Sequence, residues 1–184
     1  MNTPNNKRKK ESKERIERTF VELLQKKELK EISVSDICKR AGLNRTTFYA
    51  NYTDIYGLAD AIRDRLENDV SHLYEKEITQ GFNSHDYLKL FCHIKDNQIF
   101  YQTYFKLGYD NNYRIFAYDT ALAQRHFHNQ FVEYHIEFFK SGLTQIIKRW
   151  LQNGCKESPE DLFEIIKSEY QGRTTLFCPT DQTL

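Results

Sequence analysis

The chain contains little proline or glycine, with three prolines and seven glycines among 184 residues. Both residue types interrupt helices, and few stretches show the alternation of polar and apolar residues that favours strands. Charged residues instead alternate with apolar ones at three- and four-residue spacing, which is the pattern of amphipathic helices. The composition therefore predicts an all-α protein, long enough to bury a core without disulfides or metal.

Long apolar runs are also missing, since none approaches the roughly 18 residues that a membrane-spanning helix needs. Residues 1–10 are polar and basic, and no apolar segment of a secretory signal follows them. The cysteines are scattered without metal-ligand spacing, which indicates reduced thiols in the cytosol: Cys38, Cys92, Cys155 and Cys178. We expect a cytoplasmic protein without a membrane partner, metal or cofactor.

Sequence motifs of enzymes are absent as well. The chain has no G-x-S-x-G, no phosphate-binding loop, no G-x-G-x-x-G and no H-E-x-x-H. Acidic and basic residues occur in pairs throughout, as in any charged helical protein, and no pair differs from the rest. We therefore expect a protein that binds a partner rather than one that catalyses a reaction.

The formal net charge of +1 conceals an uneven distribution. Residues 1–60 contain 13 Lys and Arg against 9 Asp and Glu, whereas residues 61–184 contain 14 against 17. A basic N-terminal part joined to a slightly acidic remainder is the pattern expected when one end contacts nucleic-acid phosphate. A solvated surface with scattered charge would produce the same counts, so charge alone does not assign the function.

Two short helices are predicted between Ser33 and Tyr52. In Ser33-Val-Ser-Asp36, a hydroxyl at the N-cap and a carboxylate three residues later form a capping box. Gly42 ends the first helix because glycine readily adopts the left-handed conformation, and Asn44 is a good N-cap for the second helix. Two short helices joined by a glycine-containing turn form a helix-turn-helix, a motif that binds the DNA major groove.

The run S-V-S-D-I-C-K-R-A-G-L-N-R-T-T-F-Y-A-N-Y resembles the DNA-binding head of the TetR/AcrR family of bacterial repressors. That head usually reads T-V-x-x-I-A-x-x-A-G-V-S-x-G-T-x-Y-x-Y-F, and the likeness covers about residues 10–70. The run from His135 to Gly154 and the following S-P-E-D are similar to the last two helices of a subgroup common in Firmicutes. The resemblance implies an all-α homodimer in which the last two helices of each chain form a four-helix interface.

Three positions depart from the family pattern. Ile55 stands where relatives often carry a phosphate-binding lysine, and Ala50 stands where an arginine is frequent. Thr46 replaces the usual small residue of the recognition helix. These substitutions preserve the motif but remove phosphate contacts that relatives make.

The second short helix is the predicted DNA-reading element. Its base-reading candidates are Asn44, Arg45 and Thr46, because arginine can pair with guanine and a threonine methyl can contact thymine. Candidates for phosphate contacts are Ser33, Lys39, Thr47, Tyr49 and Tyr52. For Tyr49 and Tyr52 the alternative is packing in the core.

The rest of the chain is predicted to bind an effector and a second copy. Aromatic residues of its middle part suit a pocket for a small aromatic or lipophilic effector, or else a closed helical core: Phe91, Phe100, Tyr101, Tyr104, Phe105 and Phe116. A long helix from about His128 to Asn153 is apolar almost all round, which indicates burial on more than one side. With the final helix it supplies the expected dimer interface: Phe131, Phe138, Phe139, Leu143, Ile146, Ile147, Trp150, Leu162 and Ile166.

The predicted organisation has four segments. A basic disordered arm (1–11) precedes the DNA-binding domain (12–70), a helical dimerisation and ligand-binding domain (71–172) and a flexible tail (173–184). We expect a homodimeric repressor of palindromic operators, associated with the bacterial nucleoid and relieved by a small effector. The alternatives are a protein-interaction co-regulator with weak or lost DNA binding, and a small-molecule carrier or enzyme built on the aromatic segment.

Overall fold

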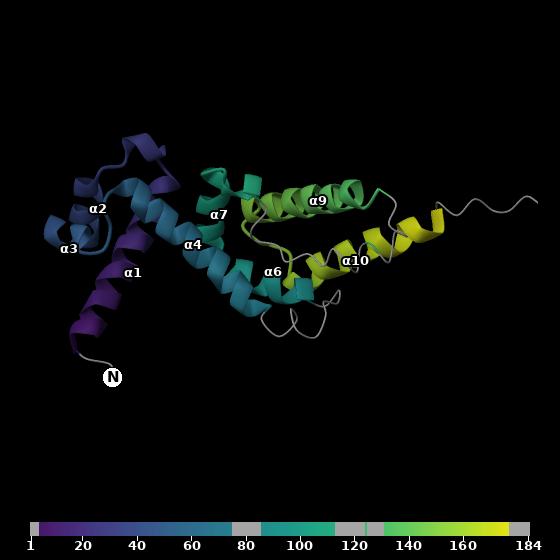
Figure 1. Ribbon diagram of the computed structural model, residues 1–184, viewed down its shortest axis with the longest axis horizontal. Coiled ribbons are helices and arrows are strands. Elements are labelled where there is room, and N and C mark those ends of the chain that lie inside the picture. Colours follow the sequence, from purple (N-terminus) through teal and green to yellow (C-terminus); the bar gives the residue numbers. More distant parts are fainter. Residues whose placement is uncertain (1–3, 75–85, 113–123, 125–130, 177–184) are drawn as a thin grey trace, which may run out of the picture. The chain divides into compact units, whose positions relative to one another are not determined.

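The computed structural model describes residues 4–74, 86–112, 124 and 131–176, and all of their regular structure is helical (Figure 1). The helices are α1 (Pro4–Leu24), α2 (Val34–Ala41), α3 (Arg45–Tyr49), α4 (Ile55–Leu73), α6 (Asp86–Asp96), α7 (Gln98–Lys106), α9 (Val132–Gln152) and α10 (Pro159–Leu176). Two 3-10 turns, η1 (Leu29–Glu31) and η2 (Tyr109–Asn112), lie between them. The predicted all-α fold is confirmed.

The chain forms two compact units. The first contains residues 1–69 and 99–112, and the second contains residues 70–98 and 113–184. The sequence predicts that residues 99–112 belong to the second domain, whereas α7 and η2 pack within the first unit. The Lys106 ammonium explains this packing in part, because it donates to the carbonyl oxygens of Leu24 (2.7 Å) and Lys27 (3.1 Å) at the end of α1.

The first helix begins earlier than the sequence predicted. Residues 4–10 are helical rather than a disordered arm, with Pro4 as the first helical residue, where proline is well tolerated. Ser12, the first residue of the predicted DNA-binding domain, donates its hydroxyl back to the Lys9 carbonyl oxygen (2.9 Å) from inside the helix. An ion pair one helical turn apart, between Lys10 and Glu14 (3.9 Å), also favours helix here.

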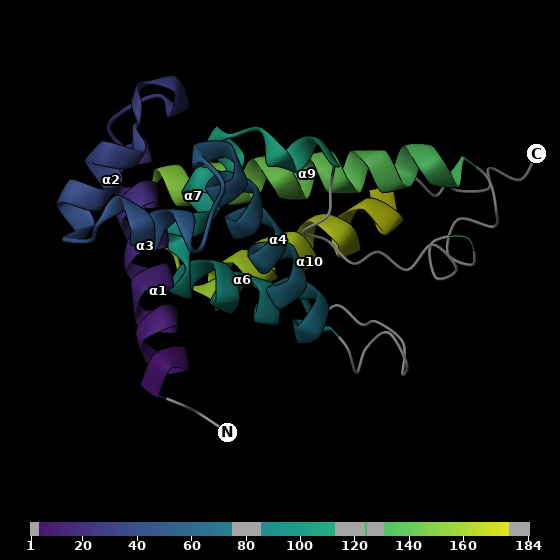
Figure 2. The same cartoon turned by 60° about the vertical axis from the view of Figure 1, so that its left-hand side comes forward.

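The helix-turn-helix forms as the sequence predicts. The Ser33 hydroxyl accepts from the Asp36 amide (3.1 Å), and the Asp36 carboxylate accepts from the Ser33 amide (3.1 Å). Gly42 ends α2 with φ +63°, and the Leu43 amide donates to the Cys38 carbonyl (2.9 Å). Figures 1 and 2 show α2 and α3 side by side, packed against α1.

Apolar side chains from four helices fill the core of the first unit. The fully or almost fully buried ones include Ile16, Phe20 and Leu24 of α1, Ile37 of α2, Phe48 of α3, and Leu58, Ile62 and Leu66 of α4. Burial of one such side chain stabilises the fold by roughly 1.5–3 kcal/mol, so these residues dominate the stability of the unit.

The second unit packs α6, α9 and α10 together. Phe91 of α6 meets Trp150 of α9 edge-to-face, with ring centroids 6.0 Å apart, and α10 packs against α6. The Trp150 indole N–H donates to the Glu157 carbonyl (3.1 Å), which fixes the turn between α9 and α10. Ser158 and Asp161, the ends of the S-P-E-D run, form a capping box at the start of α10.

The long helix α9 has one buried and one exposed apolar face. Leu143, Ile147 and Trp150 lie inside the unit, whereas Tyr134 (78% exposed) and Phe138 (64% exposed) lie outside. The sequence predicts burial on more than one side; the structure shows this for one face, and burial of the other stays a prediction. The predicted start of this helix, at about His128, lies outside the described residues.

The α2 capping box gives a pH-dependent prediction. The pKa of Asp36 lies below its ordinary value of 3.8, because the Ser33 hydroxyl and amide donate to the carboxylate. A carboxyl with a lowered folded pKa stabilises the fold above its unfolded pKa, and this stabilisation is lost as pH falls through the folded value. We expect Ser33→Ala to cost about 1 kcal/mol of the free energy of unfolding near neutral pH.

Urea unfolding of both proteins over a pH series measures this effect. The difference between them should shrink as the pH falls below about 3.8, where Asp36 becomes protonated, and a smaller difference should remain from the lost N-cap acceptor. A difference that does not change with pH would contradict the role given to the Asp36 carboxylate.

Candidate nucleic-acid interface

The outer surface of α3 carries the predicted base-reading residues. Asn44, Arg45 and Thr46 are all exposed, and Tyr49 near the end of the helix is 57% exposed. Among the described residues, no carboxylate lies within ion-pair distance of Arg45. Its guanidinium therefore keeps its donors for a ligand, and guanidinium is the group best suited to the acceptor pair on guanine.

The N-cap of α3 orients the start of this surface. The Asn44 side-chain oxygen accepts from the Thr47 amide (2.7 Å) and from the Thr47 hydroxyl (2.7 Å). This arrangement uses the side-chain oxygen of the exposed Asn44 and leaves its NH2 group for another acceptor. The Thr47 hydroxyl is half-buried and engaged with the cap, so it is a weaker candidate for phosphate than the sequence suggested.

The inner surface of α3 holds the helix on the first unit. Phe48 is fully buried, and its ring contacts those of Tyr49 (5.6 Å between centroids) and Tyr52 (5.8 Å). Tyr52 is itself 6% exposed, and its hydroxyl donates to Glu17 Oε1 on α1 (2.8 Å). Burial and this hydrogen bond raise the pKa of Tyr52 well above its ordinary value.

The phosphate contact predicted for Tyr52 is therefore wrong in this structure, and the alternative of core packing is the one observed. The phenol could not reach a phosphate without leaving Glu17 and exposing its ring. Ser33 is also a poor candidate, because its hydroxyl lies 2.9 Å from the Asp36 carboxylate, which repels an anion. The capping box predicted from the sequence already indicated a partner for the Ser33 hydroxyl, whereas the partner of Tyr52 depends on the packing of α1, which the sequence could not show.

The remaining phosphate candidates are exposed. Lys39 of α2 and Tyr49 of α3 both reach solvent, and among the described residues no acid pairs with the Lys39 ammonium at 4.0 Å or less. The neighbouring Arg40 differs, since it lies 3.6 Å from the Glu22 carboxylate. Lys39 is thus the cation of α2 that is most available to an external phosphate.

Two exposed features near the motif were missed or misjudged from the sequence. Tyr56, in the first turn of α4, is 63% exposed, and its hydroxyl can donate to a phosphate where Ile55 cannot. The signal was present in the sequence, since the residue four positions after Tyr56 is the polar Asp60. The basic run Lys7-Arg-Lys-Lys10 is exposed on the helical start of α1.

The aromatic residues predicted to form one effector pocket lie in different units. Phe91 is buried in the second unit, whereas Phe100, Tyr101, Tyr104 and Phe105 lie on α7 in the first. Phe116 is outside the described residues. Tyr101 and Tyr104 are almost fully buried, which matches the alternative of a helical core for these two side chains.

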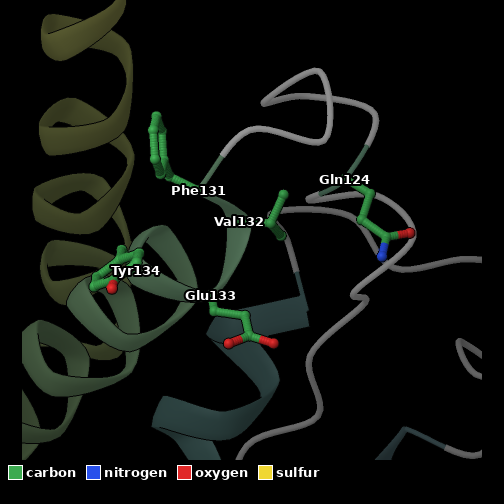
Figure 3. Close-up of a pocket in the computed structure, with 5 residues that line it drawn as sticks. All are labelled: Gln124, Phe131, Val132, Glu133 and Tyr134. Atoms are coloured by element: carbon green, nitrogen blue, oxygen red, sulfur yellow. The ribbon is translucent and has the colours of Figure 1, made fainter.

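A surface hollow of about 640 Å³ occurs instead at the start of α9. Gln124, Phe131, Val132, Glu133 and Tyr134 line it, and Figure 3 shows their side chains spread along its rim rather than converging on one point. Phe131 is 73% exposed, so the hollow is open to solvent. Among the described residues, no group of three or more His, Cys, Asp or Glu side chains could hold a metal ion.

Residues predicted for a dimer interface divide between two environments. Most are buried within the second unit: Phe139, Leu143, Ile147, Trp150, Leu162 and Ile166. Phe131 and Phe138 are exposed, and Ile146 is half-buried. Tyr134 of α9 and Ile165 of α10 (46% exposed) were missed, although Tyr134 precedes Phe138 by one helical turn.

Comparisons with known proteins agree with this fold. Residues 83–169 match a TetR-type family model described as "Transcriptional regulator C-terminal region". The HTH-type dhaKLM operon transcriptional activator DhaS of Lactococcus lactis subsp. lactis (strain IL1403) is 33% identical over 101 residues, which are 55% of this chain and 51% of that protein. The chain thus spans about half the length of the curated relative that it matches.

A solved structure, "Dihydroxyacetone kinase operon activator DhaS", aligns with 91% of this chain and 98% of its own. Its TM-score is 0.51 and its sequence identity 21%, so the likeness shows a shared all-helical fold. Within the part of the chain that the structure describes, no helix combines the length and hydrophobicity of a membrane span.

The turn between α2 and α3 gives a direct test of the motif geometry. A side chain at Gly42 would be strained at φ +63°, and its Cβ would lie 3.1 Å from Arg15 Nη2. We expect Gly42→Ala to lower the free energy of unfolding by roughly 1–2 kcal/mol, as measured by urea unfolding. Gly42→Asn should cost less, because asparagine tolerates this conformation better, and an equal loss in both variants would contradict the strain argument.

Proposed function

We propose that this chain, which belongs to the TetR family of transcriptional regulators, binds double-stranded DNA in a sequence-specific manner through α2 and α3. The observation that carries the proposal is the division of α3 into a buried Phe48 and an exposed Asn44-Arg-Thr46 surface. Such a helix can enter the major groove, while its inner face stays attached to the protein.

The proposed contacts separate into two kinds. Arg45, with Asn44 and Thr46, reads base edges, because these are the exposed residues at the start of α3. Lys39, Tyr49, Tyr56 and the basic start of α1 contact phosphates and set the register without reading sequence. Ser33 and Tyr52 are not among these contacts, because the hydroxyl of each already donates to a carboxylate of the protein.

We further propose that two copies associate through the exposed face of α9 and α10. Tyr134, Phe138 and Gly142 lie one helical turn apart along this face, and Ile165 adds an exposed apolar side chain from α10. A Cβ at Gly142 would meet nothing within 4 Å, so the glycine leaves room for another helix to approach. Two heads on one dimer would read a palindrome with half-sites about one helical turn, or a multiple of it, apart.

The direction of regulation is a separate question. Repression is the expectation from the family resemblance, whereas both DhaS proteins are described as activators. Activation is therefore the second candidate. A reporter gene behind the bound promoter, with and without the protein, distinguishes the two by the sign of the change. Relief by a small effector stays a prediction of the sequence.

The alternative is a protein-interaction co-regulator, and some features of the α2–α3 surface support it. Ala50 and Ile55 lack the cationic groups that relatives carry, and the hydroxyls of Ser33 and Tyr52 are unavailable to phosphate. A gel-shift titration with the DNA upstream of its own gene tests both readings. A salt-sensitive, sequence-preferring complex supports DNA binding, and its absence at micromolar protein favours the partner reading.

Substitutions on α2 and α3 should distinguish base-specific contacts from non-specific electrostatic attraction to DNA phosphates. We expect Arg45→Ala to weaken operator binding by roughly tenfold or more while random DNA is affected much less, because a bidentate base contact is lost. Lys39→Ala should weaken both by similar factors and reduce the salt dependence. Fluorescence-anisotropy titrations on both DNAs measure these effects, and equal losses for Arg45→Ala would contradict base reading.

A charge on the exposed face of α9 should disrupt the dimer. Phe138→Lys places a cation where two apolar surfaces would meet, so we expect a shift toward monomer in sedimentation velocity without loss of helical signal. Glu137→Lys is the control, since the adjacent position points about 100° away around the helix. Dimer retained in Phe138→Lys, or lost equally in both variants, would contradict this interface.

A further inference from the structure

Glu17 of α1 is a buried carboxylate that contacts two other segments of the first unit. It is 2% exposed, and its Oε1 accepts from the Tyr52 hydroxyl (2.8 Å). Its Oε2 lies 3.1 Å from Arg65 Nη1 on α4, and Lys13 lies 3.9 Å from Oε1 at the surface. Glutamate is rarely buried unless paired, and here each oxygen has its own partner.

A buried ion pair of this kind is not an efficient source of stability. Removing a carboxylate from water costs several kcal/mol in general, and apolar residues of similar volume often replace such pairs without loss. Hydrogen bonds, however, prefer a narrow range of distances and angles, so they fix relative positions more strictly than apolar contacts do. The arrangement around Glu17 is therefore better explained by orientation than by stability.

The segment that Glu17 orients is the end of the recognition helix. The Tyr52 amide donates to the Phe48 carbonyl (2.9 Å), and the Tyr52 ring packs on that of Phe48. Both the backbone and the side chain of Tyr52 are thus attached to the last turn of α3. A shift of the Tyr52 hydroxyl away from Glu17 would turn α3 and move Arg45 and Thr46 with it.

Arg65 extends the same chain of contacts to α7. Its guanidinium carbon lies 4.4 Å from the centroid of the Phe100 ring, which is the geometry of a cation–π contact. The buried Nε and Nη2 of Arg65 have no hydrogen-bond partner among the described residues, so the ring face is the favourable neighbour left to them. All four residues belong to the first unit.

The C-terminal end of α7 also contacts the rest of the first unit. Lys106 donates to the last carbonyls of α1, and Gln25 donates to the Thr103 hydroxyl (3.4 Å). The chain reaches α7 directly from α6 of the second unit, with only Asn97 between the two helices. A change in the second unit that pulls on α6 would therefore act on the start of α7, where Phe100 lies.

We propose that Glu17 is the positioning residue of the DNA-reading surface, and that the contacts Phe100–Arg65–Glu17–Tyr52 make the orientation of α3 depend on α7. The inference rests on the proposed DNA binding and deepens it, because it names the route by which the rest of the chain would alter that binding. Disturbing either end of the route lowers affinity for the operator more than affinity for random DNA.

Three conservative variants of the full-length protein test the route. Tyr52→Phe removes one hydroxyl and keeps the ring, Glu17→Gln removes the charge and keeps the shape, and Phe100→Leu removes the aromatic face. The control is Glu67→Gln, the same chemical change at a half-buried carboxylate that accepts from Tyr104 (3.1 Å) but does not contact α3. Each protein is titrated with the selected operator and with random DNA, and its thermal unfolding is recorded.

We expect Tyr52→Phe and Glu17→Gln to raise the operator Kd about tenfold, the loss typical of a hydrogen bond to a charged group. Phe100→Leu should raise it roughly threefold to tenfold, because it removes a cation–π contact. Their Kd for random DNA should change less than about twofold, and the control should match the wild type on both DNAs. The double variant Tyr52→Phe with Phe100→Leu should lose no more than the worse single change, because both break one route. Multiplied losses, or equal losses on both DNAs, would overturn the proposal.

Hydrogen exchange separates this inference from the proposed function. The backbone amides of Phe48 to Tyr52 should exchange faster in Phe100→Leu than in the wild type and the control, in the absence of DNA. If the wild type bound no DNA but this difference appeared, the proposed function would fail and the coupling would stand. If operator binding were normal and exchange unchanged in Phe100→Leu, the coupling would fail and the proposed function would stand.

Discussion

The recognition helix α3 is five residues long, and a helix of that length is not stable in water by itself. Its shape and direction therefore depend on side chains outside its hydrogen-bond ladder. Burial of Phe48 against the first unit is the largest of these contributions, and the Asn44 cap and the Tyr52–Glu17 hydrogen bond fix the two ends. Every proposed base contact rests on this support.

The same constraint explains why the first unit contains α7. A five-residue helix that is to contact bases must be held by neighbouring helices. Helix α7 contributes to this support, because Lys106 caps the end of α1 and Phe100 packs against Arg65 of α4. Helix α9, by contrast, packs one apolar face inside the second unit, while Tyr134 and Phe138 on another face are exposed. One part of the chain is thus suited to hold a DNA-reading surface, and another to hold a second copy.

Local structure could be predicted from the sequence, because it depends on neighbouring residues. Ser33, Gly42 and Asn44 cap or end their helices as predicted, and the family resemblance agrees with the all-helical fold. The partner of the Tyr52 hydroxyl could not be predicted, because Glu17 lies 35 residues away and looks like any surface glutamate on a charged helix. The placement of α7 in the first unit depends on long-range contacts of the same kind, and so does the assignment of Phe91 and Phe100 to different units.

Selection of bound sequences from a random double-stranded DNA pool, with the full-length protein at near-physiological salt, tests the central claim most directly. The account predicts enrichment of a palindrome with half-sites about one helical turn, or a multiple of it, apart, and Arg45→Ala should relax the preference at one position in each half-site. Recovery of unenriched sequences, or of a site without symmetry that Arg45→Ala leaves unchanged, would contradict a dimer that reads DNA through α3.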